Sequence, residues 1–327
     1  MVSRHAEMAL CYDLIMLRTL IAALLLTTPA FAAEWRYTDG AGKTVTLPEP
    51  PARIIAHSTV AAALIPYGIR PIGILRDGPP SLDRTLEGLD LTDIPVVSRG
   101  WFEIDAEAVL ALDPDIILTE YSTIEGIYQG GTNEGAMAAR LESIAPTVGI
   151  ARTNSITGML EEYRDFAASL GAATDTPALA ADRARFEAAV TGLETVTAAK
   201  PDLTVMAISP SNTDLSIAVP AYFGELSDFA RWGVHFVSPD VTPGTSYASI
   251  SWENAGSFLA DILLLDDRWE TSSLEIVADH PMGKRLPAVI ANQVGDWPAE
   301  WIRSYAVYAD QIEALTALIE RSVKLIK

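Results

Sequence analysis

Arginines and aromatic side chains follow several predicted strands in both halves of this 327-residue chain. Aromatic rings can stack on a flat ligand, and arginines can pair with its negative groups. In α/β proteins the ligand site lies at the carboxyl edge of the sheet, where these residues are expected. We therefore predict that they line a ligand-binding cleft, although each ring taken singly could equally cap a hydrophobic core. The predicted cleft residues are Arg99, Trp101, Tyr121, Tyr222, Tyr247, Trp297 and Arg303.

The sequence offers little for catalysis or for direct metal binding. His57, His235 and His280 lie far apart and lack the spacing of three or four residues that places two ligands on one helix face. The chain has no G-x-S-x-G motif, no P-loop and no G-x-G-x-x-G turn after its first strand. These observations favour a binding protein without a catalytic residue or a cofactor. A secreted enzyme that uses a carboxylate in the cleft is the alternative from another class.

A segment that occurs twice indicates how the cleft is built. One copy reads EAVLALDPDIIL from Glu107, and the other reads ENAGSFLADILLL from Glu253. In each copy the glutamate begins a short helix with an apolar pattern. Eight residues later an aspartate, Asp115 or Asp261, precedes branched aliphatic residues typical of a buried parallel strand. Two similar lobes are therefore predicted.

The remaining pattern predicts an α/β fold with two Rossmann-like lobes joined by one long interdomain helix. Residues 34–174 are assigned to the first lobe, 175–200 to the interdomain helix and 201–327 to the second lobe. Pro177 near the start of this helix and Pro201 after its end agree with helix punctuation, and the helix would be about 35 Å long. Besides a hairpin at 35–47, we expect strands at 53–56, 71–75, 115–119, 146–150, 203–208, 215–219 and 288–292. Helices are expected at 58–68, 104–112, 134–143 and 156–170. The repeated helix and strand lie near 253–265, and a closing helix is expected near 299–325.

Residues 1–33 are predicted to be a cleaved secretory signal peptide. Arg18 precedes a short apolar stretch that ends in the small-x-small sequence AFA before Ala33, which is typical of a cleavage site. The stretch is too short to span a bilayer, and a buried N-terminal helix is the alternative interpretation. Translation could begin at Met1 or at Met16.

Composition bears on the location of the protein and on the partners that its charge would repel. Cys11 is the only cysteine and precedes the apolar stretch, so the exported chain is expected to contain no disulfide and no lipid-anchoring cysteine. The formal net charge is −20 at pH 7, which would repel nucleic acid and anionic lipid. We predict a periplasmic monomer whose anionic ligand would need a local cluster of arginines.

From about Tyr37 to its C-terminus, the chain resembles the periplasmic substrate-binding proteins of iron-siderophore ABC importers. Relatives in this helical-backbone family, the class III binding proteins, bind vitamin B12 or haem. The segment EAVLALDPDIIL is similar to the family's most recognisable stretch, E-x-(I/L)-x-x-L-x-P-D-L-(I/V). The segments 39–55, 63–74 and 281–289 resemble its N-terminal segment, its first helix with the second strand, and the approach to its last strand.

The resemblance implies a receptor that binds a ferric siderophore between two rigid lobes and delivers it to an inner-membrane ABC permease. It also implies that Glu107 and Glu253 pair with arginines of the permease; alternatively, each only complements its helix dipole. Arg99 matches a position at which siderophore-binding members place an arginine facing the iron-bound oxygens. The runner-up is a haem or cobalamin receptor, with Tyr121 or Tyr247 facing the metal.

Two further positions bear on the ligand. Tyr121 and Trp297 fall near positions that supply aromatic ligand contacts in the family. Residues 101–105, WFEID, depart from the family's usual Glu-Pro-Asn before the docking glutamate. This departure leaves the choice among catecholate, hydroxamate and carboxylate siderophores open.

Overall fold

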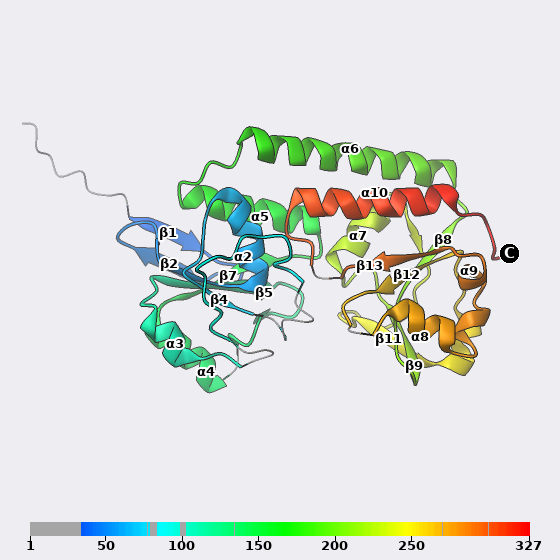
Figure 1. Ribbon diagram of the computed structural model, residues 1–327, viewed down its shortest axis with the longest axis horizontal. Coiled ribbons are helices and arrows are strands. Elements are labelled where there is room, and N and C mark those ends of the chain that lie inside the picture. The colour runs from blue at the N-terminus through cyan, green and yellow to red at the C-terminus, as the bar shows by residue number, and fades with distance from the viewer. Residues whose placement is uncertain are drawn as a thin grey trace, which may run out of the picture. The chain divides into compact units, whose positions relative to one another are not determined.

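Two separate sheets are built from separate parts of the sequence (Figure 1). The computed structural model describes residues 34–76, 78, 84–98, 103–133, 135–269, 271–299 and 301–327. Strands between residues 54 and 152 form the sheet of lobe 1, and strands between residues 204 and 297 form the sheet of lobe 2. The predicted α/β fold with two lobes is confirmed. The predicted signal peptide, residues 1–33, lies outside the described residues.

Lobe 1 contains a mostly parallel sheet with helices on both faces. Its parallel strands are, in order, β4 (Gly73–Leu75), β3 (Ile54–His57), β5 (Ile116–Ser122) and β7 (Thr147–Arg152). The short β6 (Ile127–Tyr128) runs antiparallel to the end of β5, and β1 (Trp35–Thr38) forms a hairpin with β2 (Thr44–Leu47). The helical elements are α2 (Ser58–Leu64), η1 (Ile65–Tyr67), α3 (Ala106–Ala111), α4 (Gly135–Ile144) and α5 (Ile156–Ser169).

Alternate residues of the lobe 1 strands pack against different helices. Ile54 and Ile116 belong to a core shared with α2 and α5, whereas Ile55 and Ile117 belong to a core shared with α3 and α4. Side chains point to opposite faces of a strand in turn, so both faces of this sheet need apolar residues. This requirement explains why the strands read as unbroken aliphatic runs.

The sheet of lobe 2 is mixed, whereas the sheet of a Rossmann-like lobe is mostly parallel. Its strand order is β11 (Tyr247–Ser251), β9 (Asp214–Ala218), β8 (Thr204–Pro210), β12 (Ile262–Asp266) and β13 (Val294–Trp297), with β10 (His235–Phe236) also on β8. The strands β8, β10, β12 and β13 are parallel, but β9 and β11 are antiparallel because β8 returns through a short turn into β9. The helical elements are α7 (Gly224–Arg231), η2 (Trp252–Ser257), α8 (Ser273–Asp279), η3 (Gly283–Arg285), α9 (Pro287–Ile290) and α10 (Tyr305–Arg321).

The strand predicted at 288–292 is wrong. Most of that segment forms α9, which begins at Pro287, a residue whose fixed φ favours the first position of a helix. Asn292 then takes a positive φ of 55°, and the strand β13 begins two residues later at Val294. The second copy of the repeat also differs from the first. Its helix is the 3₁₀ element η2, which has no side-chain cap.

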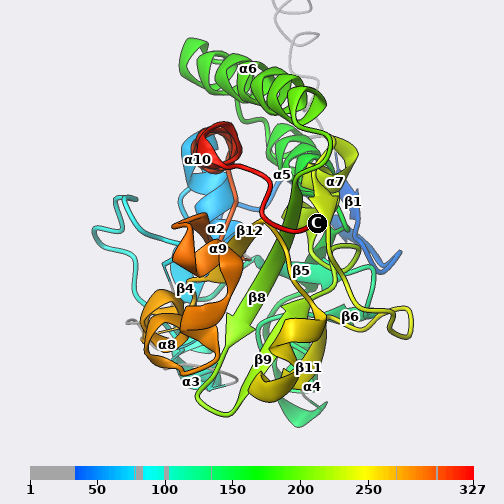
Figure 2. The same ribbon diagram turned by 90° about the vertical axis from the view of Figure 1, so that its right-hand side faces the viewer.

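A 23-residue helix, α6 (Pro177–Ala199), connects the two sheets as predicted. Thr176 caps its first turn by accepting a hydrogen bond from the amide of Leu179 (3.4 Å). The helix lies along α10 of lobe 2 in both views (Figure 1, Figure 2), and Arg185 joins the two helices through Asp310 (2.6 Å). The lobe boundaries at 174/175 and 200/201 stay a prediction. In the part of the chain that is described, no helix is long and apolar enough to cross a bilayer.

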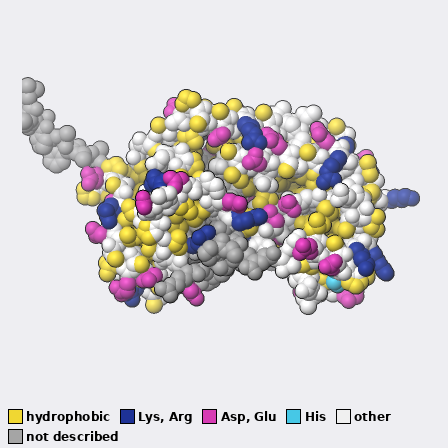
Figure 3. Space-filling model, in the orientation of Figure 1, with side chains coloured by type: hydrophobic (Ala, Val, Ile, Leu, Met, Phe, Trp, Pro, Cys, Tyr) yellow, Lys and Arg dark blue, Asp and Glu magenta, His cyan; other side chains and the backbone are white. Residues whose placement is uncertain are grey.

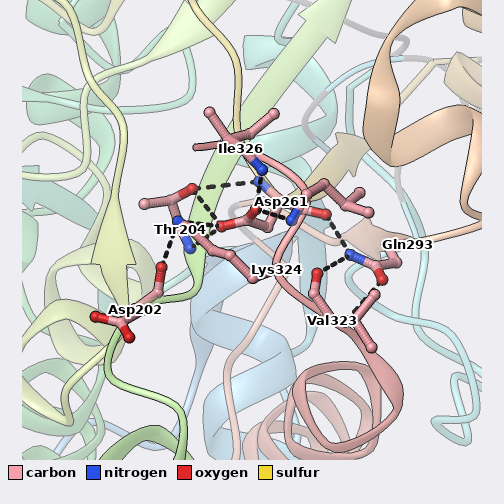
Figure 4. Close-up of polar contacts among 8 residues, drawn as sticks. Asp202, Thr204, Asp261, Gln293, Val323, Lys324 and Ile326 are labelled. Atoms are coloured by element: carbon pink, nitrogen blue, oxygen red, sulfur yellow. Dashed lines mark hydrogen bonds and ion pairs between the residues drawn. The ribbon is translucent and has the colours of Figure 1, made fainter.

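In each lobe the repeated aspartate accepts hydrogen bonds at the start of the neighbouring strand. Oδ2 of Asp115 accepts the amides of Ala52 (2.9 Å) and Arg53 (2.7 Å) at the start of β3. Oδ2 of Asp261 accepts the amide and the hydroxyl of Thr204 at the start of β8, each at 2.8 Å (Figure 4). Each aspartate therefore fixes where its strand begins to pair with the neighbouring parallel strand.

We call each of these groups of hydrogen bonds a clip. The second clip, at Asp261, contains more hydrogen bonds than the first, at Asp115. Oδ1 of Asp261 also accepts the amides of Leu325 (2.6 Å) and Ile326 (2.8 Å), and Lys324 pairs with Oδ2 (2.9 Å). Gln293 holds the same tail by bonding the carbonyl of Val323 (Figure 4). The C-terminal tail is thus part of the lobe 2 fold.

Candidate ligand-binding site between the lobes

Residues of both lobes meet in a small crevice. Lobe 1 contributes the ends of β5 and β7 and the start of α5, and lobe 2 contributes the start of α7 and the segment before α10. The lining residues of this inter-lobe crevice are Ile124, Arg152, Thr153, Ile156, Met159, Tyr222, Phe223, Gly224, Glu225 and Arg303. This is the edge at which α/β proteins bind ligands.

A buried ion pair crosses between the lobes at this crevice. Arg303 donates from Nε to Oε1 of Glu120 (2.8 Å) and from Nη2 to Oε2 (3.1 Å), and the two residues are 4% and 2% exposed. The hydroxyl of Tyr163 in α5 also donates to Glu120. Burial by itself would raise the pKa of Glu120, but Arg303 and Arg152 outweigh burial and lower it. Glu120 therefore stays a carboxylate and joins the two lobes.

Two more exposed contacts join the lobes at the same edge. Arg84 pairs through Nη2 with Oδ2 of Asp267 (2.7 Å), and its guanidinium lies 4.0 Å from the centroid of the Trp301 ring. The hydroxyl of Tyr222 donates to Oε1 of Glu125 (2.6 Å). These exposed contacts also link the two lobes in this structure.

Arginines that the sequence analysis did not select also lie at these strand ends. Arg76 directly follows β4, Arg152 is the last residue of β7, and Arg268 lies two residues after β12. Arg268 donates to both oxygens of Asp266 (2.9 and 2.8 Å) and to the hydroxyl of Tyr247 (2.6 Å). Figure 3 shows acidic and basic side chains interspersed on one face of the molecule. An arginine within two residues of a strand's end was the signal that could have found them.

The predicted cleft residues do not all reach the crevice. Tyr222 lines it, and Tyr247 is half-buried beside Phe223, with ring centroids 5.1 Å apart. Tyr121 lies at the end of β5 and contacts the ring of Tyr128, with centroids 5.2 Å apart. Arg99 and Trp101 lie outside the described residues.

Two predicted cleft residues have other partners. Trp297 is 1% exposed, donates from Nε1 to Oε1 of Glu225 (2.7 Å) and packs against Phe223. It belongs to a hydrophobic core that residues of both lobes form, as the alternative interpretation of the rings allowed. Arg303 does line the crevice, but its guanidinium is bound to Glu120. Both partners come from distant parts of the sequence.

The two repeated glutamates are exposed, one on each lobe. Glu107 lies in the first turn of α3, where Asp105 caps the helix, and it pairs with Arg140 of α4. Glu253 lies in η2, where hydrogen bonds from its own backbone and from Ser251 lower its pKa. Neither glutamate lines the inter-lobe crevice. Both side chains are exposed at the surface of the protein.

The described histidines, His57, His235 and His280, lie in separate parts of the fold. His57 is buried at the end of β3, where Nδ1 lies 2.9 Å from the hydroxyl of Thr59. Within the described residues, no group of three or more His, Cys, Asp or Glu side chains is placed to hold a metal ion.

Comparisons with known proteins agree with this geometry. DesE, a ferric-siderophore receptor protein from Streptomyces coelicolor, is 28% identical, with a TM-score of 0.79 over 89% of this chain and 99% of DesE. Petrobactin-binding protein YclQ from Bacillus subtilis shares the fold: it is 18% identical, with a TM-score of 0.66 over 88% of this chain and 99% of YclQ. The catecholate-siderophore binding protein VctP from Vibrio cholerae also shares the fold, at 18% identity and a TM-score of 0.63 over 88% of this chain and 99% of VctP.

No curated protein sequence matches the chain. A family model described as periplasmic binding protein matches residues 78–301, which span most of both lobes and the helix between them. The resemblance seen in the sequence is thereby confirmed: the chain belongs to the periplasmic binding protein family.

Proposed function

We propose that this protein is a periplasmic receptor, not an enzyme, which binds a ferric siderophore between its lobes and delivers it to an ABC permease. The observation that carries the proposal is the set of arginines at the carboxyl ends of strands in both lobes, including Arg76, Arg152 and Arg268. Ferric siderophores present oxygen donors with negative charge, which arginine recognises well. The similarity to DesE over almost its whole length supports the same ligand class.

The ligand class can be tested by absorbance and fluorescence. Protein purified from iron-replete cells should show a broad visible charge-transfer band, whereas a Soret band would indicate haem and a corrinoid spectrum would indicate cobalamin. Trp269 is exposed beside Arg268, at the edge of lobe 2, so its emission should report on binding. A quenching screen across ferric catecholates, ferric hydroxamates and ferric citrate should then identify the siderophore class.

Arg99 is predicted to supply positive charge to the ligand. The Arg99→Ala variant should bind its ferric siderophore more weakly by about 1.5–3 kcal/mol, because a charge-assisted hydrogen bond is lost. Its melting temperature should stay close to that of the wild type. Tryptophan quenching titrations measure the affinity, and Arg285→Ala, an exposed arginine in η3, is the matched control. Unchanged affinity in Arg99→Ala would remove Arg99 from the site.

Glu107 and Glu253 are predicted to dock the permease. Reversing both charges, Glu107→Arg with Glu253→Arg, should reduce siderophore uptake by about tenfold or more, since like charges would then face each other. The ligand dissociation constant should not change, because neither residue lines the crevice.

Uptake of iron-loaded siderophore is measured in cells that lack any other receptor for the ligand. Glu275→Arg is the control, because Glu275 is also exposed in the first turn of a helix but lies outside the repeat. Wild-type transport by the double variant would falsify the docking role. Each glutamate would then only complement the dipole at the start of its own helix.

A further inference from the structure

A second cavity lies on the helical side of the molecule, under the start of α6. It has a volume of about 460 Å³. Lobe 1 contributes Tyr67 of η1 and Leu160 of α5, α6 contributes Leu179, and lobe 2 contributes Ser304 and Tyr305 at the start of α10 (Figure 1). We call this cavity the hinge pocket. Its size and mostly apolar lining are those of small-molecule sites in proteins.

Tyr305, which lines the hinge pocket, carries a buried hydroxyl for which the described residues provide no hydrogen-bond partner. Tyr305 is 8% exposed, and its hydroxyl is buried without a hydrogen-bond partner among the described residues. Tyr67 also lines the pocket, and burial raises its pKa. Burial likewise raises the pKa of Tyr305, so it remains a hydrogen-bond donor at neutral pH. Unsatisfied buried groups of this kind are rare and call for a ligand or another function.

The surroundings of this hydroxyl favour a negative charge. Arg183 lies over the Tyr305 ring, 5.7 Å from its centroid, and Arg164 also lines the pocket. Their present partners, Glu187 (3.2 Å) and Asp165 (2.9 Å), form exposed pairs, which contribute little and are easily exchanged. The start of the 17-residue helix α10 adds the positive end of its dipole.

Two carboxylates limit this preference. Asp175 and Asp182 line the pocket as well, and Arg303, the third arginine in its wall, is already bound to Glu120. The excess of positive charge is therefore small. It suits one negative group and not the several that a multiply charged ligand carries.

We propose that the hinge pocket binds a small aromatic monocarboxylate, whose carboxylate accepts the Tyr305 hydrogen bond while its ring lies against Tyr67, Leu160 and Leu179. Because the lining comes from both lobes and from the helix between them, an occupant would hold the lobes in one arrangement. The site lies apart from the inter-lobe crevice, with Arg303 as the one residue that lines both. The inference stands whether or not a siderophore binds in that crevice.

The test uses 2-naphthoate as the probe and isothermal titration calorimetry on the exported chain. Wild-type protein should bind one equivalent. Tyr305→Phe should bind about tenfold more weakly, since it loses only the donated hydrogen bond, and its melting temperature without naphthoate should not fall. Ala180→Phe, which places a ring at an exposed position in the pocket lining, should abolish binding.

Ala184→Phe is the matched control, because Ala184 is also an exposed alanine of α6 but does not line the pocket. It should bind naphthoate like the wild type, and circular dichroism should show that all variants are folded. Absence of binding by the wild type overturns the proposal. Undiminished binding by Ala180→Phe would also overturn it, because the naphthoate would then occupy another site.

Discussion

Replacing Arg303 with methionine should lower the free energy of unfolding by about 3–5 kcal/mol, because Glu120 would remain buried without its main partner. Arg303 and Glu120 are both almost fully buried, and their two hydrogen bonds join strand β5 of lobe 1 to the segment before α10 of lobe 2. A surface arginine that contacts only a ligand would leave stability unchanged when replaced. Urea denaturation of the ligand-free protein, followed by tryptophan fluorescence, measures the loss.

The double variant, Arg303→Met with Glu120→Leu, is the critical companion. Removing both charges should recover most of the stability, since an apolar pair of similar volume replaces a buried ion pair at little cost. If Arg303→Met alone is as stable as the wild type, the pair is not formed in solution. Arg303 would then be able to contact the ligand, as the sequence predicted.

Replacing Asp261 with asparagine should cost about 3 kcal/mol, because the carboxylate accepts hydrogen bonds from both ends of lobe 2. Thr204 lies on one side of it, and Leu325 and Ile326 lie on the other. The asparagine has the same shape but directs an NH₂ group at donors, so at least one amide is left unpaired. Thermal and urea unfolding measure the difference.

The effect of Asp261 should depend on pH. Burial by itself would raise its pKa, but the amides of Ile326 and Leu325, together with Lys324, hold the pKa well below its ordinary value. A carboxyl whose pKa is lowered on folding stabilises the protein above its unfolded pKa of about 3.9 and loses that contribution as the pH falls. The stability gap between the wild type and Asp261→Asn should therefore narrow below about pH 4.

Asp115→Asn is the natural control for this prediction. Asp115 occupies the equivalent place in lobe 1 but accepts only two backbone amides, and it is less buried. Its replacement should cost about 1 kcal/mol. Equal losses at the two positions would contradict the view that the C-terminal tail is what sets the second clip apart.

Local sequence was sufficient wherever the determinants of structure are local. The ends of α6 were predicted to within two residues because Thr176 caps the first turn and Pro177 occupies the first helical position. The buried strands β3, β5 and β12 were predicted because sheets that are covered on both faces require aliphatic runs. The repeated aspartates marked the starts of equivalent strands before their hydrogen-bond partners were known.

Sequence was insufficient where a side chain's role depends on a distant partner. Trp297 and Arg303 have the composition of a ligand site, but their partners Glu225 and Glu120 lie 72 and 183 residues away. No pattern near Trp297 distinguishes a ring that donates to a buried carboxylate from a ring that stacks on a ligand. Arg152 and Arg268 were missed because the predicted cleft residues were chosen near aromatic residues. The position of each arginine at the end of a strand was the simpler signal.

The clip at Asp261 also constrains the order in which the lobes can fold during synthesis. Every strand of lobe 1 ends by Arg152, so its sheet can pair while the rest of the chain is still being made. The carboxylate of Asp261 lacks three of its donors until Lys324, Leu325 and Ile326 have been synthesised, about sixty residues after β12. A nascent chain halted before residue 324 should therefore display a protease-resistant lobe 1 followed by a lobe 2 that is still cleaved.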